Sequence, residues 1–78
     1  METFSILLDG EQYKVSFHPD IRKFMIIQHR TGLYIMYQQY DNKWQSVNGN
    51  RFSTNLPVNY LYNEVVFRIR IGYRSALM

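Results

Sequence analysis

The chain contains no cysteine among its 78 residues. Neither a disulfide nor a thiolate metal site can therefore form, and the absence weakly favours a reducing compartment. No stretch approaches the roughly 20 apolar residues that a membrane helix needs. The N-terminus also lacks the basic segment and apolar run of a signal peptide. We therefore expect a soluble, cytoplasmic protein that does not bind a membrane.

Glycine is scarce, and each of the four glycines stands at a turn or at the end of an element. No glycine-rich loop precedes a helix, so the phosphate-binding motifs are missing. The acidic residues are scattered, and no pair suggests a general acid and base. His18 and His29 are expected at opposite ends of one strand, which separates His29 from His18 and Asp20. We therefore expect a non-enzymatic protein with no cofactor and no metal.

The length sets the scale of the fold. A chain of 78 residues buries only about 60–65% of its unfolded surface, which predicts a single domain, 1–78, with one modest core. The formal charge of +3 and the pI near 9.4 are one cue for nucleic-acid binding. Nine basic against six acidic residues is a small excess, typical of an ordinary solvated surface.

The first strands are the clearest feature of the pattern. Two alternating runs, 3–8 and 11–18, are joined by Asp9-Gly10, a strong signal for a two-residue hairpin turn. This turn pairs Leu8 with Glu11 and so sets the register of the whole hairpin. One face then collects the apolar side chains: Phe4, Ile6, Leu8, Tyr13, Val15 and Phe17.

Residues 22–29 and 33–40 predict a second hairpin, which turns through Arg30 to Gly32 in a loop of two residues or of three with a bulge at Gly32. Both of its faces are apolar: Phe24 and Tyr37 alternate with further large side chains along each strand. Strands of this kind are usually covered on both sides. After a turn at Asp41-Asn42, "KWQSV" predicts a short fifth strand, and "RFSTN" is an edge segment or a loop.

The sequence of the C-terminal segment is compatible with either a strand or a helix. Residues 64–74 alternate like a strand. As a helix over 57–71, the segment has one apolar arc, a cap at Thr54 or Asn55, and Pro57 in its first turn. The arc consists of Val58, Leu61, Tyr62, Val65, Val66, Ile69 and Tyr73. Arginines near the end suit the negative pole of such a helix: Arg68, Arg70 and Arg74.

The helix explains more of the segment than the strand does. We therefore predict an α+β fold, an antiparallel β-meander of four to five strands with one C-terminal helix packed on one face. The alternative is an all-β small barrel or sandwich with residues 64–74 as its last strand.

Three motifs carry a family resemblance: "F-x-I-x-x-D-G-x-x-Y-x-V-x-F" (4–17), "K-W-Q" (43–45), and "L-P" (56–57) before the amphipathic tail. The chain resembles small uncharacterised bacterial single-domain proteins, built as a β-meander followed by a C-terminal amphipathic helix. The resemblance implies the same fold and no particular activity. The tail "VVFRIRIGY" departs from the more helix-favouring tail of that group.

One helix covers only one face of such a sheet, which would leave Tyr and Met side chains bare on the other. Soluble monomers rarely expose such a surface, and Tyr and Met are enriched at interfaces. We therefore expect a homodimer or a protein partner. The predicted interface comprises Tyr34, Met36, Tyr37 and Tyr40 on the sheet, with a second stripe on the helix, Tyr60, Phe67 and Ile71.

The alternative function is single-stranded nucleic-acid binding, in which aromatic rings stack on bases and arginines contact phosphates. Its candidate residues are Tyr34, Tyr40 and Trp44 with Arg22, Arg30 and Arg51. Against this function, strands generally prefer aromatic residues, and Trp44 is expected in the core.

Overall fold

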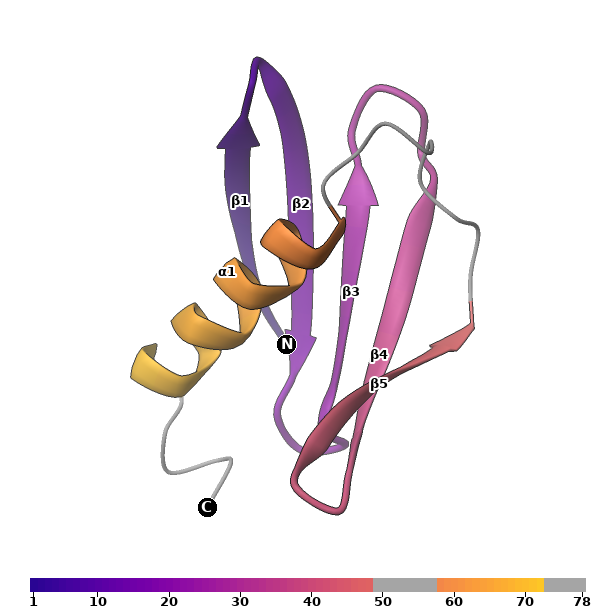
Figure 1. The fold of residues 1–78 in the computed structure, drawn as a ribbon, viewed down its shortest axis with the longest axis vertical. Coiled ribbons are helices and arrows are strands. Elements are labelled where there is room, and N and C mark those ends of the chain that lie inside the picture. The colour runs from indigo at the N-terminus through magenta and orange to yellow at the C-terminus, as the bar shows by residue number, and fades with distance from the viewer. Residues whose placement is uncertain (49–57, 73–78) are drawn as a thin grey trace.

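The structure is a computed structural model that describes residues 1–48 and 58–72. Five antiparallel strands form one sheet in the order β1-β2-β3-β4-β5, and α1 crosses one face of it obliquely (Figure 1). The predicted α+β meander is confirmed. Five predicted features lie outside the described residues: the helix caps, Pro57, the "RFSTN" segment, Tyr73 and Arg74. The elements are β1 (Glu2–Leu8), β2 (Glu11–His18), β3 (Lys23–Gln28), β4 (Tyr34–Tyr40), β5 (Lys43–Asn48) and α1 (Val58–Gly72).

Two tight turns determine the register of the outer hairpins. Asp9 and Gly10 both have positive φ, 50° and 79°, and Leu8 faces Glu11 as predicted. Asp41 and Asn42 repeat this geometry, with φ of 54° and 63°. Two successive left-handed residues form the turn whose twist matches that of paired strands, and Asp, Asn and Gly tolerate this conformation.

The core lies between α1 and the sheet face beneath it. Phe24 is its centre: its ring stacks on Tyr37 at 4.8 Å and meets the edge of Trp44 at 4.7 Å, measured between ring centroids. The Tyr62 ring of α1 lies 5.0 Å from that of Tyr37. The buried apolar side chains are Ile6, Tyr13, Val15, Phe17, Phe24, Ile26, Tyr37, Trp44, Leu61, Val65, Val66 and Ile69.

Tyr37 therefore requires a correction. The sequence places it on the association surface, but only 7% of the residue is exposed. Tyr37 pairs with Phe24, and Phe24 pairs with Phe17. Residues paired across an antiparallel sheet share a face, so Tyr37 belongs to the face that α1 covers.

The helix over the C-terminal segment excludes the all-β alternative. Its buried residues, Leu61, Val65, Val66 and Ile69, all belong to the predicted apolar arc. Val58 and Tyr62 pack against the core at its margin.

Arg68 ties α1 to the edge strand β1. Its Nη1 donates to the carbonyl oxygen of Ser5 at 3.2 Å, and its guanidinium lies 5.5 Å from the centre of the Phe4 ring. Its Nε also forms an ion pair with Glu64 at 3.1 Å. Arg68 thus occupies a carbonyl of an edge strand that another chain could otherwise pair with.

Stability should decrease in alkaline solution. Burial raises the pKa of the Tyr37 hydroxyl, and burial is also the main cause that raises the pKa of Tyr13. A phenol whose pKa is higher in the folded state contributes its full stability below the unfolded pKa and loses it as the pH rises toward the folded pKa. We expect the free energy of unfolding to fall above about pH 10, by up to about 1.4 kcal/mol per pH unit for each tyrosine.

Denaturant unfolding across the alkaline range tests this expectation. Tyr37→Phe cannot ionise at this position and should make the fall shallower. A fall of unchanged slope in this variant would show that Tyr37 does not contribute.

Candidate interaction surface

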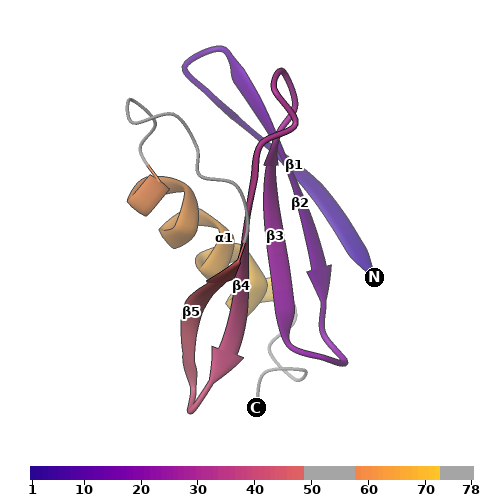
Figure 2. The ribbon, with the colours of Figure 1, turned by 90° about the vertical axis from the view of Figure 1, so that its right-hand side faces the viewer.

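The sheet has a second face, opposite α1, which we call the open face. No element of the described residues covers it, and Figure 2 shows α1 entirely on the other side of the sheet. Its centre is an apolar patch of Met25, Ile27, Tyr34 and Met36. Met25 pairs with Met36 and Ile27 with Tyr34, so the four side chains adjoin one another across β3 and β4. All four are partly exposed.

Three lysines share the open face with this apolar patch. Lys14 pairs with Ile27 and lies beside the patch on β2. Lys23 and Lys43 are the first residues of β3 and β5, where Lys23 pairs with Gln38 and Lys43 with Tyr40. Since side chains alternate along a strand, all three lysines project from the open face.

No carboxylate occupies a strand position on this face. Glu2 and Glu11 pair with Phe17 and Leu8, so both belong to the face beneath α1. The remaining acidic residues are in turns or on the helix: Asp9, Asp20, Asp41 and Glu64. The strand positions of the open face thus combine an apolar centre with charge of one sign.

The predicted interface residues fall on two separate surfaces. Tyr34, Met36 and Tyr40 lie on the open face, and Tyr40 is 71% exposed. The second set lies on the outer side of α1, away from the sheet: Tyr60, Phe67 and Ile71. The sequence predicted the helix residues as a second stripe, and this stripe and the open face lie on opposite sides of the molecule.

Sequence reasoning missed the lysines and half of the apolar patch. Lys14, Lys23 and Lys43 had no assigned role, and Met25 and Ile27 were treated only as strand residues. The signal that could have found them is the alternation with Val15, Phe24 and Trp44, which point into the core.

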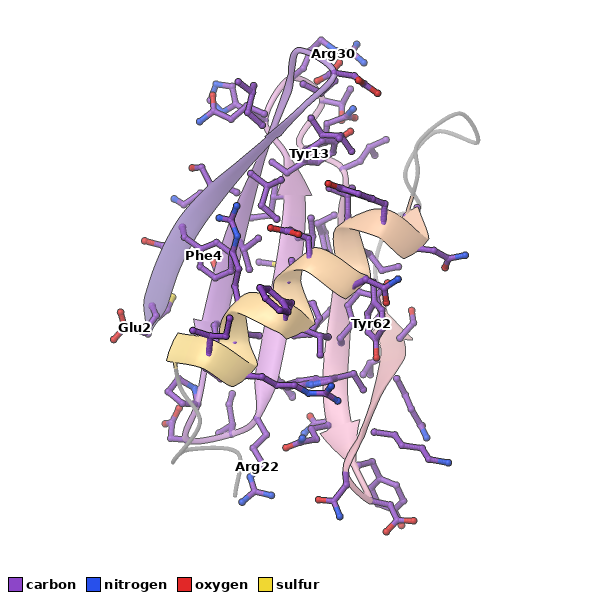
Figure 3. All side chains as sticks on the ribbon, turned by 60° about the vertical axis from the view of Figure 1, so that its left-hand side comes forward. Glu2, Phe4, Tyr13, Arg22, Arg30 and Tyr62 are labelled. Carbon is purple, nitrogen blue, oxygen red and sulfur yellow. The ribbon has the colours of Figure 1, made fainter. Side chains whose placement is uncertain are left out.

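The residues proposed for stacking and binding nucleic acid do not converge. Trp44 is buried, with its ring against those of Phe17 and Phe24. Arg22 and Arg30 lie at opposite ends of the sheet (Figure 3), and Arg30 Nε is paired with Glu11 at 2.8 Å. Arg51 lies outside the described residues.

Tyr34 and Tyr40 are the two rings of that set that remain on the open face. They are separated by about 20 Å along a strand that rises about 3.3 Å per residue. They are therefore too far apart to stack on neighbouring bases.

Within residues 1–48 and 58–72, no three His, Cys, Asp or Glu side chains group as a metal site would require. His18 is the last residue of β2, and His29 follows β3 at the other end of the sheet. The one helix in this part of the chain is too short and too polar to cross a membrane.

Fold and surface together define a class: a small α+β domain in which a five-stranded meander is covered by a helix on one face and bare on the other. No protein-family model, curated protein or solved structure matches the chain. The likeness to small bacterial meander-and-helix proteins stays a prediction.

Proposed function

We propose that this chain is a non-enzymatic binding module that docks a protein segment carrying carboxylates and apolar side chains on the open face. One observation carries the proposal: an apolar patch shares the open face with three lysines, and no carboxylate occupies a strand position of that face. The ligand class follows from matching each part of the surface to its complement.

The composition of the apolar patch favours a protein ligand. Met25 and Met36 are unbranched thioethers that adapt to irregular apolar surfaces. Together with Tyr34 they are of the types enriched at protein interfaces. A nucleic-acid platform instead uses successive aromatic rings, one for each stacked base.

The positive charge of the open face favours a different protein, and not a second copy of this chain, as its partner there. A twofold interface brings the same surface of each copy together. On the open face this would place Lys14, Lys23 and Lys43 against the lysines of the second copy. Like charges brought together in this way cost several kcal/mol, whereas carboxylates of a different partner would neutralise them.

Lys23→Glu tests this function. The probe is a short amphipathic helical peptide with leucines on one face and glutamates along its borders, and the readout is fluorescence anisotropy at low salt. We expect the reversal to weaken binding about tenfold or more, which corresponds to about 1.4 kcal/mol. Arg70→Glu is the matched control: it makes the same charge change on α1, and its affinity should stay within about twofold of the original.

Two results would contradict the proposal. One is equal weakening by Lys23→Glu and Arg70→Glu, because the binding would then depend on net charge alone. The other is tight binding of a thymidine oligonucleotide, with an affinity that falls steeply as salt rises, where the peptide does not bind. That outcome would assign the open face to single-stranded nucleic acid.

A further inference from the structure

The helix α1 carries a second apolar stripe on its outer side. Tyr60, Phe67 and Ile71 are 54%, 60% and 67% exposed. At about 100° per residue these three positions fall within one narrow arc, opposite the side that packs on the sheet. A helix with apolar stripes on both sides is suited to being covered on both sides.

We propose that the outer side of α1 pairs with α1 of a second copy, antiparallel, about a twofold axis close to Val66. In such a pair, a residue a given number of positions before Val66 in one copy lies level with the residue the same number of positions after Val66 in the second copy. Tyr60 precedes Val66 by six positions and Ile71 follows it by five. These separations differ by one position, so Tyr60 lies within about 1.5 Å of the level of Ile71 of the second copy, and the two Phe67 rings meet near the axis.

The charges beside the stripe select this arrangement. Glu64 and Arg68 lie along one border of the stripe, two positions before and two positions after Val66. In the antiparallel pair Glu64 is therefore level with Arg68 of the second copy, and the reverse contact forms at the same time. The side chains of Glu64 and Arg68 are 32% and 43% exposed, so a neighbouring chain can reach both.

A parallel pair lacks this complementarity. Its twofold axis runs along the helices, so the border with Arg68 faces the opposite border of the second copy. That border contains Arg70, and two arginines would meet at nearly the same height. The same register in the antiparallel pair places Arg70 near Asn63 of the second copy, where no like charge opposes it.

The expected dimer is weak. Three apolar side chains from each copy make an interface below the standard size of stable complexes, so we expect association only toward high micromolar concentration. Because α1 and the open face lie on opposite sides of the sheet (Figure 2), pairing through α1 leaves both open faces outward. The dimer does not depend on the proposed function, but its use as a bivalent binder does.

Mixing two charge-reversed variants tests the register. Glu64→Arg alone opposes arginine with arginine across the axis, and Arg68→Glu alone opposes glutamate with glutamate. Each variant should dissociate about tenfold more readily than the original chain. An equal mixture restores both opposite-charge contacts in a heterodimer, whose dissociation constant should return to within about threefold of the original. Sedimentation equilibrium measures the dissociation constants of the original chain, of each variant and of their mixture. Circular dichroism confirms that each variant is folded.

Phe67→Asp provides a second test. Because Phe67 is largely exposed, its substitution changes the surface of α1 without opening the core. This variant should be monomeric at every concentration. The proposal is overturned by an original chain that stays monomeric up to millimolar concentration, or by a mixture that associates no better than its components. It is also overturned if Phe67→Asp remains dimeric while Met36→Asp becomes monomeric, because the dimer would then form through the open face.

Discussion

Phe24→Ala is expected to lower the free energy of unfolding by about 3–5 kcal/mol. The Phe24 ring is fully buried beneath α1 and contacts rings from three other elements, those of Tyr37, Trp44 and Tyr62. Truncation removes the buried apolar surface of the ring and leaves a cavity that these rigid neighbours fill only in part. For a domain of this size the loss is a large fraction of the total stability.

The matched control is Met25→Ala, at the next position of β3. Met25 points to the open face and is only partly buried, so its truncation should cost about 1 kcal/mol. Urea unfolding of both variants gives the comparison. Equal losses would mean that both faces of β3 are covered and that the open face does not exist.

The second large effect is expected in α1, from Ile69→Ala. Ile69 is fully buried against the sheet, and its truncation should lower the free energy of unfolding by about 2–5 kcal/mol. Ile71→Ala should change stability by about 0.5 kcal/mol or less, because Ile71 is 67% exposed and alanine is the better helix former.

Comparing Ile69→Ala with Ile71→Ala distinguishes a helix from a strand as well as core from surface. Residues two positions apart share a face in a strand but lie on opposite sides of a helix. Comparable losses at Ile69 and Ile71, measured on the monomer at low protein concentration, would therefore contradict α1.

The N-terminal hairpin was predictable because local chemistry determines it. Asp9 and Gly10 accept the left-handed conformation of a two-residue turn, and that turn allows one register for the strands beside it. The register places Ile6, Tyr13 and Val15 on one face, where the structure buries them.

The covered face of the second hairpin was harder to predict. Both faces of β3 and β4 are apolar, so alternation alone does not distinguish them. The deciding link is the turn between β2 and β3, which aligns Phe17 with Phe24 and thereby places Tyr37 in the core. That turn includes Arg22 at a φ of 54°. Unlike Asp, Asn or Gly, an arginine gives no sequence signal for this conformation, and so the register was not deducible.

The C-terminal segment was ambiguous for a different reason. Its last part alternates as a strand does and also has a helical apolar arc. The outer stripe of α1 explains the alternation: Phe67 and Ile71 are apolar although they do not contribute to the core. The contact of Arg68 with Ser5 was beyond sequence reasoning, because only the packed fold brings together positions so far apart in the chain.

The central claim is that the open face is a binding surface for an acidic, partly apolar protein segment. The most direct measurement is NMR of chains labelled with ¹³C in the methionine methyl groups, titrated with the leucine and glutamate peptide. The sequence has four methionines, and two of them, Met25 and Met36, pair at the centre of the apolar patch. The account predicts that the Met25 and Met36 signals move together and saturate as the peptide is added. Saturable peptide binding that leaves both signals unmoved would contradict it.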